Sequence, residues 1–349
     1  MTTMLLKFVG QISSLMPLRM LEVFSKQKLY CPFYHALAGD KSLPHIKHLY
    51  QLRTVEQFRN DLEYLLKTHQ AIGLSDIRDH ISGNKPITNK SFFVSFDDGL
   101  REVYDYAFPI MQSLGVPATT FLNSDFVDNK GLFYGYKASL IVDAIASGTL
   151  SHTTLATAYK TTQTENPESL QHYVLSLRYA DQPILNKLAN LFEINFEEFL
   201  HHEKPYMTSE QISTMCNSGY TFGGHSIDHP HFDDIDLNEQ LRQAAISTKH
   251  ASRLTNADIT SFAFPFSDAY VSEHFFEQNS AHTFADIIFG TQGYKLDMDA
   301  RIVHRHWLEG SSESTAKFIK LEHAKSALNR LRGADRVVRP KNELRGAVN

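Results

Sequence analysis

Two adjacent carboxylates, Asp97 and Asp98, follow an apolar run of residues, Phe92-Phe93-Val94-Ser95-Phe96, and precede Gly99. The aromatic and β-branched run predicts a buried strand. Successive strand residues point to opposite faces, but a sharp turn at a glycine could bring both carboxylates to one cavity. Two buried charges are costly unless something pairs with them or binds them. The alternative is a strand followed by an Asx-type turn with solvated carboxylates.

A second polar group follows a short apolar stretch at Phe222-Gly223-Gly224, where His225 and His229 lie four positions apart. One helical turn would place both imidazoles on the same side. Neutral imidazole is a common zinc ligand, and three protein ligands plus water form a catalytic zinc site. A histidine pair is weak evidence in a chain with 18 histidines. With a carboxylate from another strand end, the ligand set would be complete.

The segments around these residues alternate between strand and helix patterns. Residues 29–36 predict a first strand, in which Pro32 favours an edge or an irregular position. Thr54 and Gln57 form a capping box that opens a helix, and the strand at 92–96 is followed by a helix and another strand at 118–122. Strand, helix and strand with short connections are typical of a parallel α/β arrangement.

Residues 124–206 differ, because their apolar positions recur at helical spacing. We interpret them as a helical insertion, after which the α/β pattern resumes with strands near 220–222, 261–264, 284–289 and 301–307. The predicted organisation is an N-terminal segment (1–28), an α/β unit (29–314) interrupted by the insertion, and a C-terminal helix with a basic tail (315–349).

Together the two polar motifs resemble those of a known family. Ser95-Phe96-Asp97-Asp98-Gly99 is similar to the first motif of the NodB-type polysaccharide deacetylases (carbohydrate esterase family four). His225-Ser226-Ile227-Asp228-His229 is similar to their second motif, H-[ST]-x-x-H, and residues 116–121 resemble the segment after the first motif. The resemblance covers about residues 29–122 and 206–307.

The resemblance implies a distorted parallel (β/α) barrel that binds a divalent metal, usually zinc, and removes an acetyl group from a sugar. By motif position Asp98, His225 and His229 would bind the metal, and Asp97 would be the general base. The backbone N–H of Phe266, in the third motif, would help to stabilise the oxyanion.

The third and last motifs depart from the family pattern. Many members have an arginine that orients the base, but here Ala263 occupies that position. Arg301 or Arg305 could replace it, or either could form an ordinary ion pair.

In the last motif His304 and His306 are candidates for the general acid, and on a strand they share one face while Arg305 takes the other. A structural role is equally open for both histidines. Asp268 is a further weak candidate.

Several residues are candidates for contact with the substrate. His35 follows the first strand, where a barrel would present it near the mouth. Tyr34, Phe266 and Trp307 could stack on a sugar ring or belong to the core. His225 lies 128 positions after Asp97, and the helical insertion explains this long separation. The insertion could cap the cleft, or it could be a peripheral subdomain or an oligomer contact.

Composition restricts the remaining function classes. Of 349 residues, 42% are hydrophobic and 21% are charged, which is ordinary for a globular protein. A net charge of −5 argues against bulk nucleic-acid binding. Cys31 and Cys216 match no metal or redox spacing and are expected to be free thiols. No apolar run is long enough to span a bilayer.

The two ends of the chain leave membrane contact open. Residues 1–9 are a poor signal peptide, but a membrane-surface helix over residues 4–24 is an open alternative. The basic tail from residue 324 is expected to be solvated, or to touch anionic lipid or a partner.

We therefore expect a deacetylase for N- or O-acetyl groups on a polysaccharide, oligosaccharide or glycan precursor. The precursor would be nucleotide- or lipid-linked, and the protein cytoplasmic, with peripheral contact at the inner membrane face left open. The alternatives are a related metal-dependent amidohydrolase acting on a non-sugar amide and a catalytically silent glycan-binding barrel. The sequence does not indicate the oligomeric state.

Overall fold

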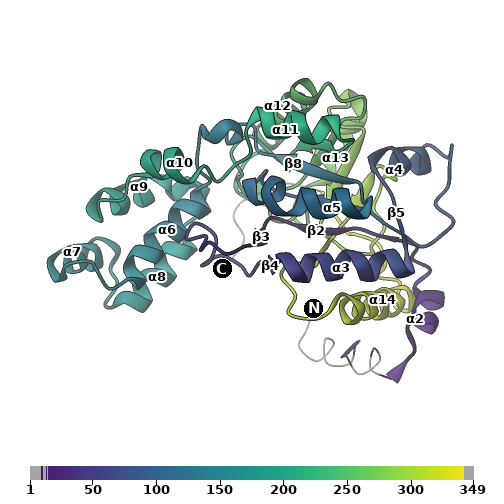
Figure 1. Ribbon diagram of the computed structural model, residues 1–349, viewed down its shortest axis with the longest axis horizontal. Coiled ribbons are helices and arrows are strands. Elements are labelled where there is room, and N and C mark those ends of the chain that lie inside the picture. Colours follow the sequence, from purple (N-terminus) through teal and green to yellow (C-terminus); the bar gives the residue numbers. More distant parts are fainter. Residues whose placement is uncertain (1–8, 11–12, 14, 342–349) are drawn as a thin grey trace.

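The computed structural model describes residues 9–10, 13 and 15–341 (Figure 1). Its centre is a sheet of eight parallel strands. In spatial order these are β12 (Ile302–His304), β11 (Ile287–Gly290), β10 (Ser261–Ala263), β9 (Thr221–Gly224), β8 (Ala118–Leu122), β7 (Val94–Phe96), β2 (Pro32–Tyr34) and β13 (His306–Trp307).

The two edge strands of this sheet, β12 and β13, are consecutive in the chain and only Arg305 separates them. The Arg305 N–H donates to the Gly290 carbonyl at 2.9 Å, and the His306 N–H donates to the Cys31 carbonyl at 2.7 Å. One continuous segment therefore binds both edges of the sheet and nearly closes it as a barrel. The predicted parallel α/β barrel is confirmed.

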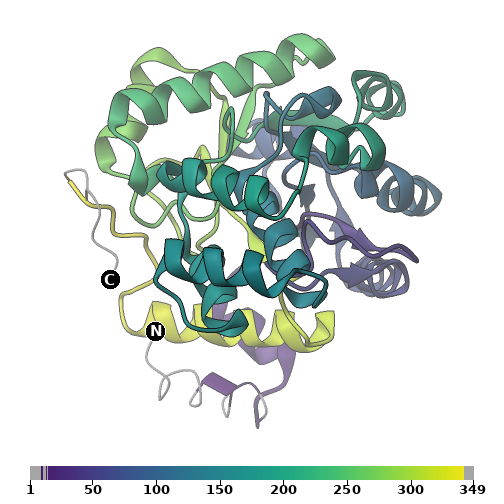
Figure 2. The same ribbon diagram turned by 90° about the vertical axis from the view of Figure 1, so that its left-hand side faces the viewer.

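Helices surround the barrel (Figure 2). They are α2 (Leu18–Ser25), α3 (Val55–Thr68), α4 (Leu74–Ile81), α5 (Phe108–Leu114), α11 (Ser209–Asn217), α12 (Leu237–Thr255), α13 (Glu273–His282) and α14 (Thr315–Leu331). The predicted capping box of Thr54 and Gln57 opens α3, with both of its hydrogen bonds formed. A π-helical turn at Val103–Ala107 precedes α5.

The first predicted strand, residues 29–36, is divided in the structure. Leu29–Tyr30 forms β1, which pairs with β6 (Ser91–Phe92), itself paired with β5 (Gln70–Ala71). Of the two positions expected for Pro32, an edge or an irregular one, the structure shows the second, because Pro32 begins β2 directly after the break at Cys31, inside the main sheet. The first residue of a strand is a position where the missing N–H of proline is tolerated. β3 (Leu37–Ala38) pairs separately with β4 (Arg53–Thr54).

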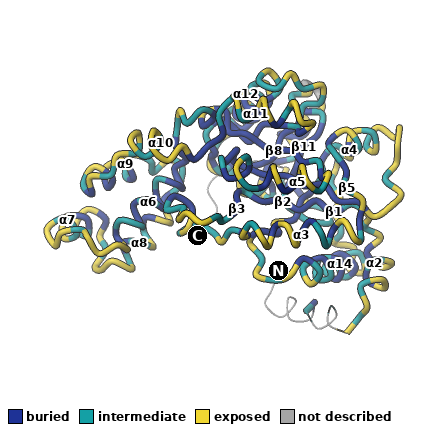
Figure 3. Tube along the Cα trace, viewed as in Figure 1, coloured by how far each residue is buried: buried dark blue, intermediate teal, exposed yellow. Residues whose placement is uncertain are grey.

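The residues predicted as a helical insertion form a lobe beside the barrel (Figures 1 and 2). It contains α6 (Tyr134–Ala146), α7 (His152–Thr162), α8 (Pro167–Ser176), α9 (Gln182–Leu191) and α10 (Phe196–Glu203). Its helices bury a core that includes Ile141, Leu170 and Leu185 and is joined by Ala36, Ile46 and Leu100 from loops of the barrel. The inner sides of these helices are buried (Figure 3). Side-chain contacts hold the lobe to the loop after β9; among them, Arg178 bonds Asp234 at 2.7 Å, and the Tyr179 hydroxyl donates to Asp228.

The two ends of the chain differ from the sequence expectation in one respect. Arg339, expected in a solvated tail, is buried and donates to Asp268 at 2.8 Å and to Asp297. A buried carboxylate pair needs a cation, and Arg339 supplies it. Residues 342–349 of the tail, and residues 4–8, 11–12 and 14 of the predicted membrane-surface helix, lie outside the described residues. Among the described helices, none has the length and apolar character needed to cross a membrane.

Candidate active site

The turn after β7 brings both carboxylates to one cavity. Asp98 and Gly99 each have a φ of +69°, so the backbone leaves the strand in a left-handed conformation immediately after Asp97. Asp97 is 2% exposed and Asp98 is 5% exposed. The alternative of a solvated Asx-type turn is therefore wrong. Three other residues of this site, Ser226, His229 and Phe266, also have left-handed φ values. Strained backbone of this kind is often found at functional sites.

Arg305 holds Asp97 through a two-point ion pair. Its Nη1 lies 2.7 Å from Oδ1 and its Nη2 lies 2.9 Å from Oδ2. The guanidinium is fully buried between the rings of Phe33 and Phe121, 4.5 and 5.1 Å from their centroids. Burial opposes ionisation of Asp97, but the charge of Arg305 holds the pKa of this carboxyl below its ordinary value.

The other arginine proposed from sequence lies elsewhere. Arg301 pairs with Asp299 at 2.6 Å in a partly exposed site. Of the two arginines that the sequence suggested as partners of Asp97, the structure places Arg305 against it.

Asp98, His225 and His229 converge as a group of three ligand atoms that lie within 4.8 Å of one another. Asp98 Oδ1 lies 3.2 Å from His229 Nε2 and 3.5 Å from His225 Nε2. His225 Nδ1 lies 2.9 Å from the Ala263 carbonyl, which only accepts hydrogen bonds. This nitrogen therefore carries the proton, and Nε2 faces Asp98 with a free lone pair.

These three residues fit a divalent metal. Within the described part of the chain, Asp98 Oδ1 is buried without a hydrogen-bond partner, which is costly unless a cation binds there. Burial lowers the pKa of His225 to about 4, so the imidazole is neutral at pH 7, as a metal ligand must be. Two imidazoles and one carboxylate suit zinc in a site with an open fourth position.

The second oxygen of Asp98 is bound by a residue that sequence reasoning missed. The Tyr136 hydroxyl donates to Asp98 Oδ2 at 2.7 Å, and it lies 3.3 Å from the Tyr50 hydroxyl. Tyr136 is fully buried and belongs to α6 of the insertion. The insertion thus reaches the candidate metal site directly. No sequence motif marks Tyr136, so only the folded structure identifies it.

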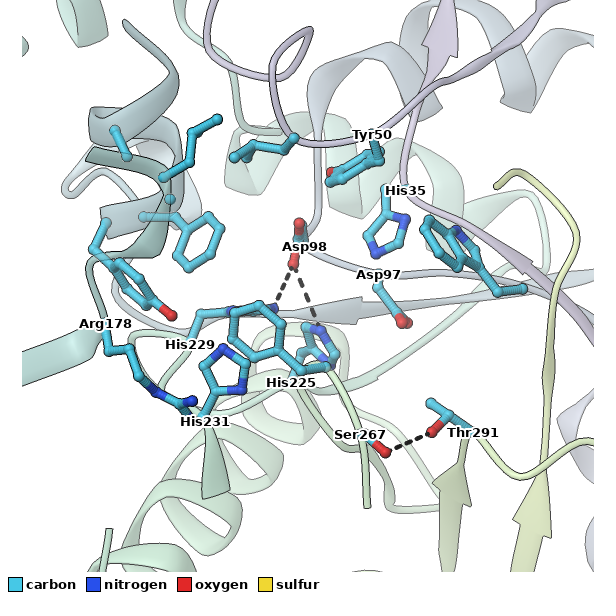
Figure 4. Close-up of a pocket in the computed structure, with 18 of the residues that line it drawn as sticks. His35, Tyr50, Asp97, Asp98, Arg178, His225, His229, His231, Ser267 and Thr291 are labelled. Carbon is cyan, nitrogen blue, oxygen red and sulfur yellow. Dashed lines mark hydrogen bonds and ion pairs between the residues drawn. The ribbon is translucent and has the colours of Figure 1, made fainter. Parts of the chain in front are cut away.

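His35, predicted as a substrate contact, lines the cavity together with Tyr50 and Trp307 (Figure 4). Its Nδ1 lies 2.7 Å from Oε2 of Glu309, which also accepts from the backbone N–H groups of His35 and Ala36. Burial lowers the pKa of His35, but the hydrogen bond and the charge of Glu309 outweigh it and raise this pKa to about 9. Sequence reasoning did not identify Glu309.

His304 and His306, the candidates for the general acid, are not among the residues that line the cavity. His304 Nε2 lies 2.9 Å from Asp297, and both side chains are fully buried. The His306 ring packs between Tyr30 and Tyr294, and burial lowers its pKa to about 3. Arg305 takes the inward face, so strand alternation turns both histidines away from the cavity. Asp268 is likewise buried beneath Arg339.

The cavity has a volume of about 720 Å³ and lies between the barrel and the insertion (Figure 4). Phe266 and Trp307 are 41% and 45% exposed at its rim. The Phe266 ring stacks on His231, with centroids 3.4 Å apart. Tyr34, by contrast, is fully buried against Phe58 and Phe96, so it belongs to the core.

The fold and this arrangement define a parallel α/β barrel in which a carboxylate held by an arginine lies beside a candidate metal site. The chain belongs to the polysaccharide deacetylase family, whose model matches residues 84–282. It is therefore a carbohydrate deacetylase. No match is found among curated proteins.

Solved structures of deacetylases share the fold. The Streptococcus pyogenes deacetylase PplD, solved in complex with acetate, is 13% identical, with a TM-score of 0.53 over 85% of this chain and 98% of that one. IcaB from Ammonifex degensii is 15% identical, with a TM-score of 0.52 over 85% and 97% of the two chains. A de-N-acetylase from Aggregatibacter actinomycetemcomitans is 14% identical, with a TM-score of 0.52 over 83% and 99%.

Proposed function

We propose that this chain is a metal-dependent deacetylase that hydrolyses N- or O-acetyl groups of a glycan or glycan precursor. The observation that carries the proposal is the adjacency of two sets of groups. Asp98, His225 and His229 form a compact ligand set with an orphaned carboxylate oxygen. The adjacent Asp97 is not one of these three residues, and Arg305 holds its carboxylate through two hydrogen bonds.

Each residue of the site has a distinct part in this proposal. A divalent metal, most simply Zn²⁺, supplies Lewis-acid polarisation and lowers the pKa of water when it is bound. Asp97 accepts a proton from the attacking water, because Arg305 keeps it ionised and directs its oxygens. The Phe266 backbone N–H remains the proposed donor to the developing oxyanion.

We assign the general acid to His35 in place of His304 or His306. A pKa of about 9 keeps His35 protonated at pH 7, which a residue that donates to a leaving amine or alcohol requires. Glu309 fixes the ring through Nδ1 and leaves the other ring nitrogen free to donate. His35 lines the same cavity as Asp97.

The cellular setting is also a proposal. A cytoplasmic glycan precursor, with the protein at the inner membrane face, is supported by α2, where Met20, Val23 and Phe24 are 48%, 71% and 49% exposed. Exposed apolar side chains beside the basic Arg19 and Lys26 suit an anionic lipid surface. Co-sedimentation with anionic vesicles tests this. Binding that the double variant Val23→Asp/Phe24→Asp does not reduce would contradict it.

The decisive experiment measures acetate release from a panel of N- and O-acetylated sugars, with and without added Zn²⁺. We expect release that a chelator abolishes and Zn²⁺ restores, and that Asp98→Ala eliminates together with bound metal. Asp79→Ala, at a partly exposed carboxylate distant in sequence from the motifs, is the control. Full activity and metal content in Asp98→Ala would refute the proposal. Hydrolysis of cyclic ureides instead, or sugar binding without acetate release, would favour the alternatives.

A further inference from the structure

The candidate active site has two chemically different parts. The residues that line its floor are charged or imidazole groups, among them Asp97, Asp98 and His35. The side that faces the insertion is lined by four aliphatic residues, Leu49, Ala138, Leu175 and Leu177, together with the aromatic rings of Phe133 and Tyr134. The acetyl group needs contact for only one methyl group, so this side offers more apolar surface than the reaction requires.

The insertion supplies three of these four aliphatic residues. Ala138 belongs to α6, Leu175 belongs to α8, and Leu177 follows the end of α8. Leu177 is anchored in the core of the insertion, whereas Leu175 is 37% exposed. The contacts of the neighbouring Arg178 and Tyr179 with the loop after β9 hold the end of α8 over the cavity. The aliphatic side is thus a fixed part of the site.

Two polar side chains on this side, Arg178 and Ser176, are already engaged. Arg178 is its cation, and Asp234 and Asp233 lie 2.7 and 3.5 Å from the guanidinium, so a phosphate or an acidic sugar would have to compete with them. The Ser176 hydroxyl donates to the Tyr173 carbonyl at 2.8 Å. Sugar hydroxyl groups placed against the aliphatic residues would lose their hydrogen bonds to water without adequate replacement.

We infer that Leu49, Ala138, Leu175 and Leu177 form a subsite for a hydrocarbon chain attached to the acetylated sugar. The inference rests on the proposed function and narrows its substrate class to a glycolipid, in which a sugar carries an alkyl, acyl or isoprenyl chain. The sugar lies over the polar floor and the chain lies against the insertion. A cavity of about 720 Å³ is in the usual range for ligands much larger than one acetyl group.

Trp307 provides a direct measurement of binding. It is the single tryptophan of the chain and lines the cavity at the side of His35. Its fluorescence can be followed while the zinc-loaded Asp97→Asn variant, in which turnover is blocked, is titrated with the methyl and the octyl β-glycosides of N-acetylglucosamine. We expect the octyl glycoside, kept below its micellar concentration, to bind about tenfold more tightly or better, since about two buried methylenes suffice for that factor.

The aliphatic side is tested by Leu175→Asp in the same background. This change should bring the octyl-to-methyl affinity ratio close to one. Leu331→Asp, at a leucine that is 80% exposed on α14, should leave the ratio unchanged. Equal affinities for the two glycosides, including the absence of binding by both, would overturn the inference. So would tighter binding of an N-acetylated tetrasaccharide than of the octyl glycoside. Acetate release from other acetylated glycans would still support the deacetylase itself.

Discussion

Arg305 donates two parallel hydrogen bonds to Asp97, with Nη1···Oδ1 and Nη2···Oδ2 distances of 2.7 and 2.9 Å. The arginine comes from the segment that closes the barrel, not from the third motif, where Ala263 stands. The Ala263 carbonyl instead accepts the proton of His225 Nδ1. Asp97 and His225 are therefore held by different parts of the sheet, Asp97 by the segment between β12 and β13 and His225 by β10.

Arg305→Lys should lower kcat by about tenfold or more, because an ammonium cannot form the two-point contact that fixes Asp97. Steady-state acetate release measures the change. Arg305→Met should also destabilise the fold by about 3–5 kcal/mol, since it leaves a buried carboxylate unpaired. Arg301→Lys is the matched control and should match the wild type. Wild-type kcat in Arg305→Lys would show that Asp97 needs no such orientation.

Tyr136→Phe should weaken Zn²⁺ binding by about 10–100-fold, the usual effect of removing a hydrogen bond to a metal ligand. The change removes one hydroxyl group and keeps the ring packed in the core. Competition with a chromophoric chelator measures the metal affinity independently of activity. Tyr159→Phe, in α7 of the same insertion, is the control. Unchanged metal affinity in Tyr136→Phe would mean that the insertion does not support the site.

The pH profile of kcat should have a falling limb near pH 9, the pKa of His35. The acid form of His35 is required, so activity is present below this pKa and is lost as the pH rises through it. Glu309→Gln removes the charge that raises the pKa, and the limb should move to lower pH. A limb at the same pH in this variant would exclude His35 as the titrating group.

His304→Gln should lower stability by about 1–3 kcal/mol, because it disrupts a buried polar cluster with Asp297. It should leave kcat within about twofold of the wild type, whereas His35→Gln should lower kcat by about 10²–10⁴-fold, the range for a lost general acid. Thermal unfolding and acetate release, measured on both variants, separate the two effects. A loss of activity without a loss of stability in His304→Gln would restore it as the acid.

Much of the fold could be predicted because local sequence specifies it. Capping boxes mark helix starts such as Thr54, and short runs of apolar and β-branched residues mark buried parallel strands such as 118–122. Strand breaks were less predictable. Residues 29–36 divide between two strands because each part pairs with a different distant segment.

The sequence alone determined the chemical groups at the two strand ends: Asp97 and Asp98 with a turn after them, and His225 and His229 at a fixed spacing. It also determined that Arg305 and the two flanking histidines face opposite ways. Only the tertiary structure decided which way is inward, because strand alternation has no preferred face until the sheet closes. In the closed sheet Arg305 pairs with Asp97, and His35 lies at hydrogen-bond distance from Glu309. Tyr136 of the insertion donates a hydrogen bond to Asp98. These contacts join residues far apart in the chain, so no local pattern could specify them.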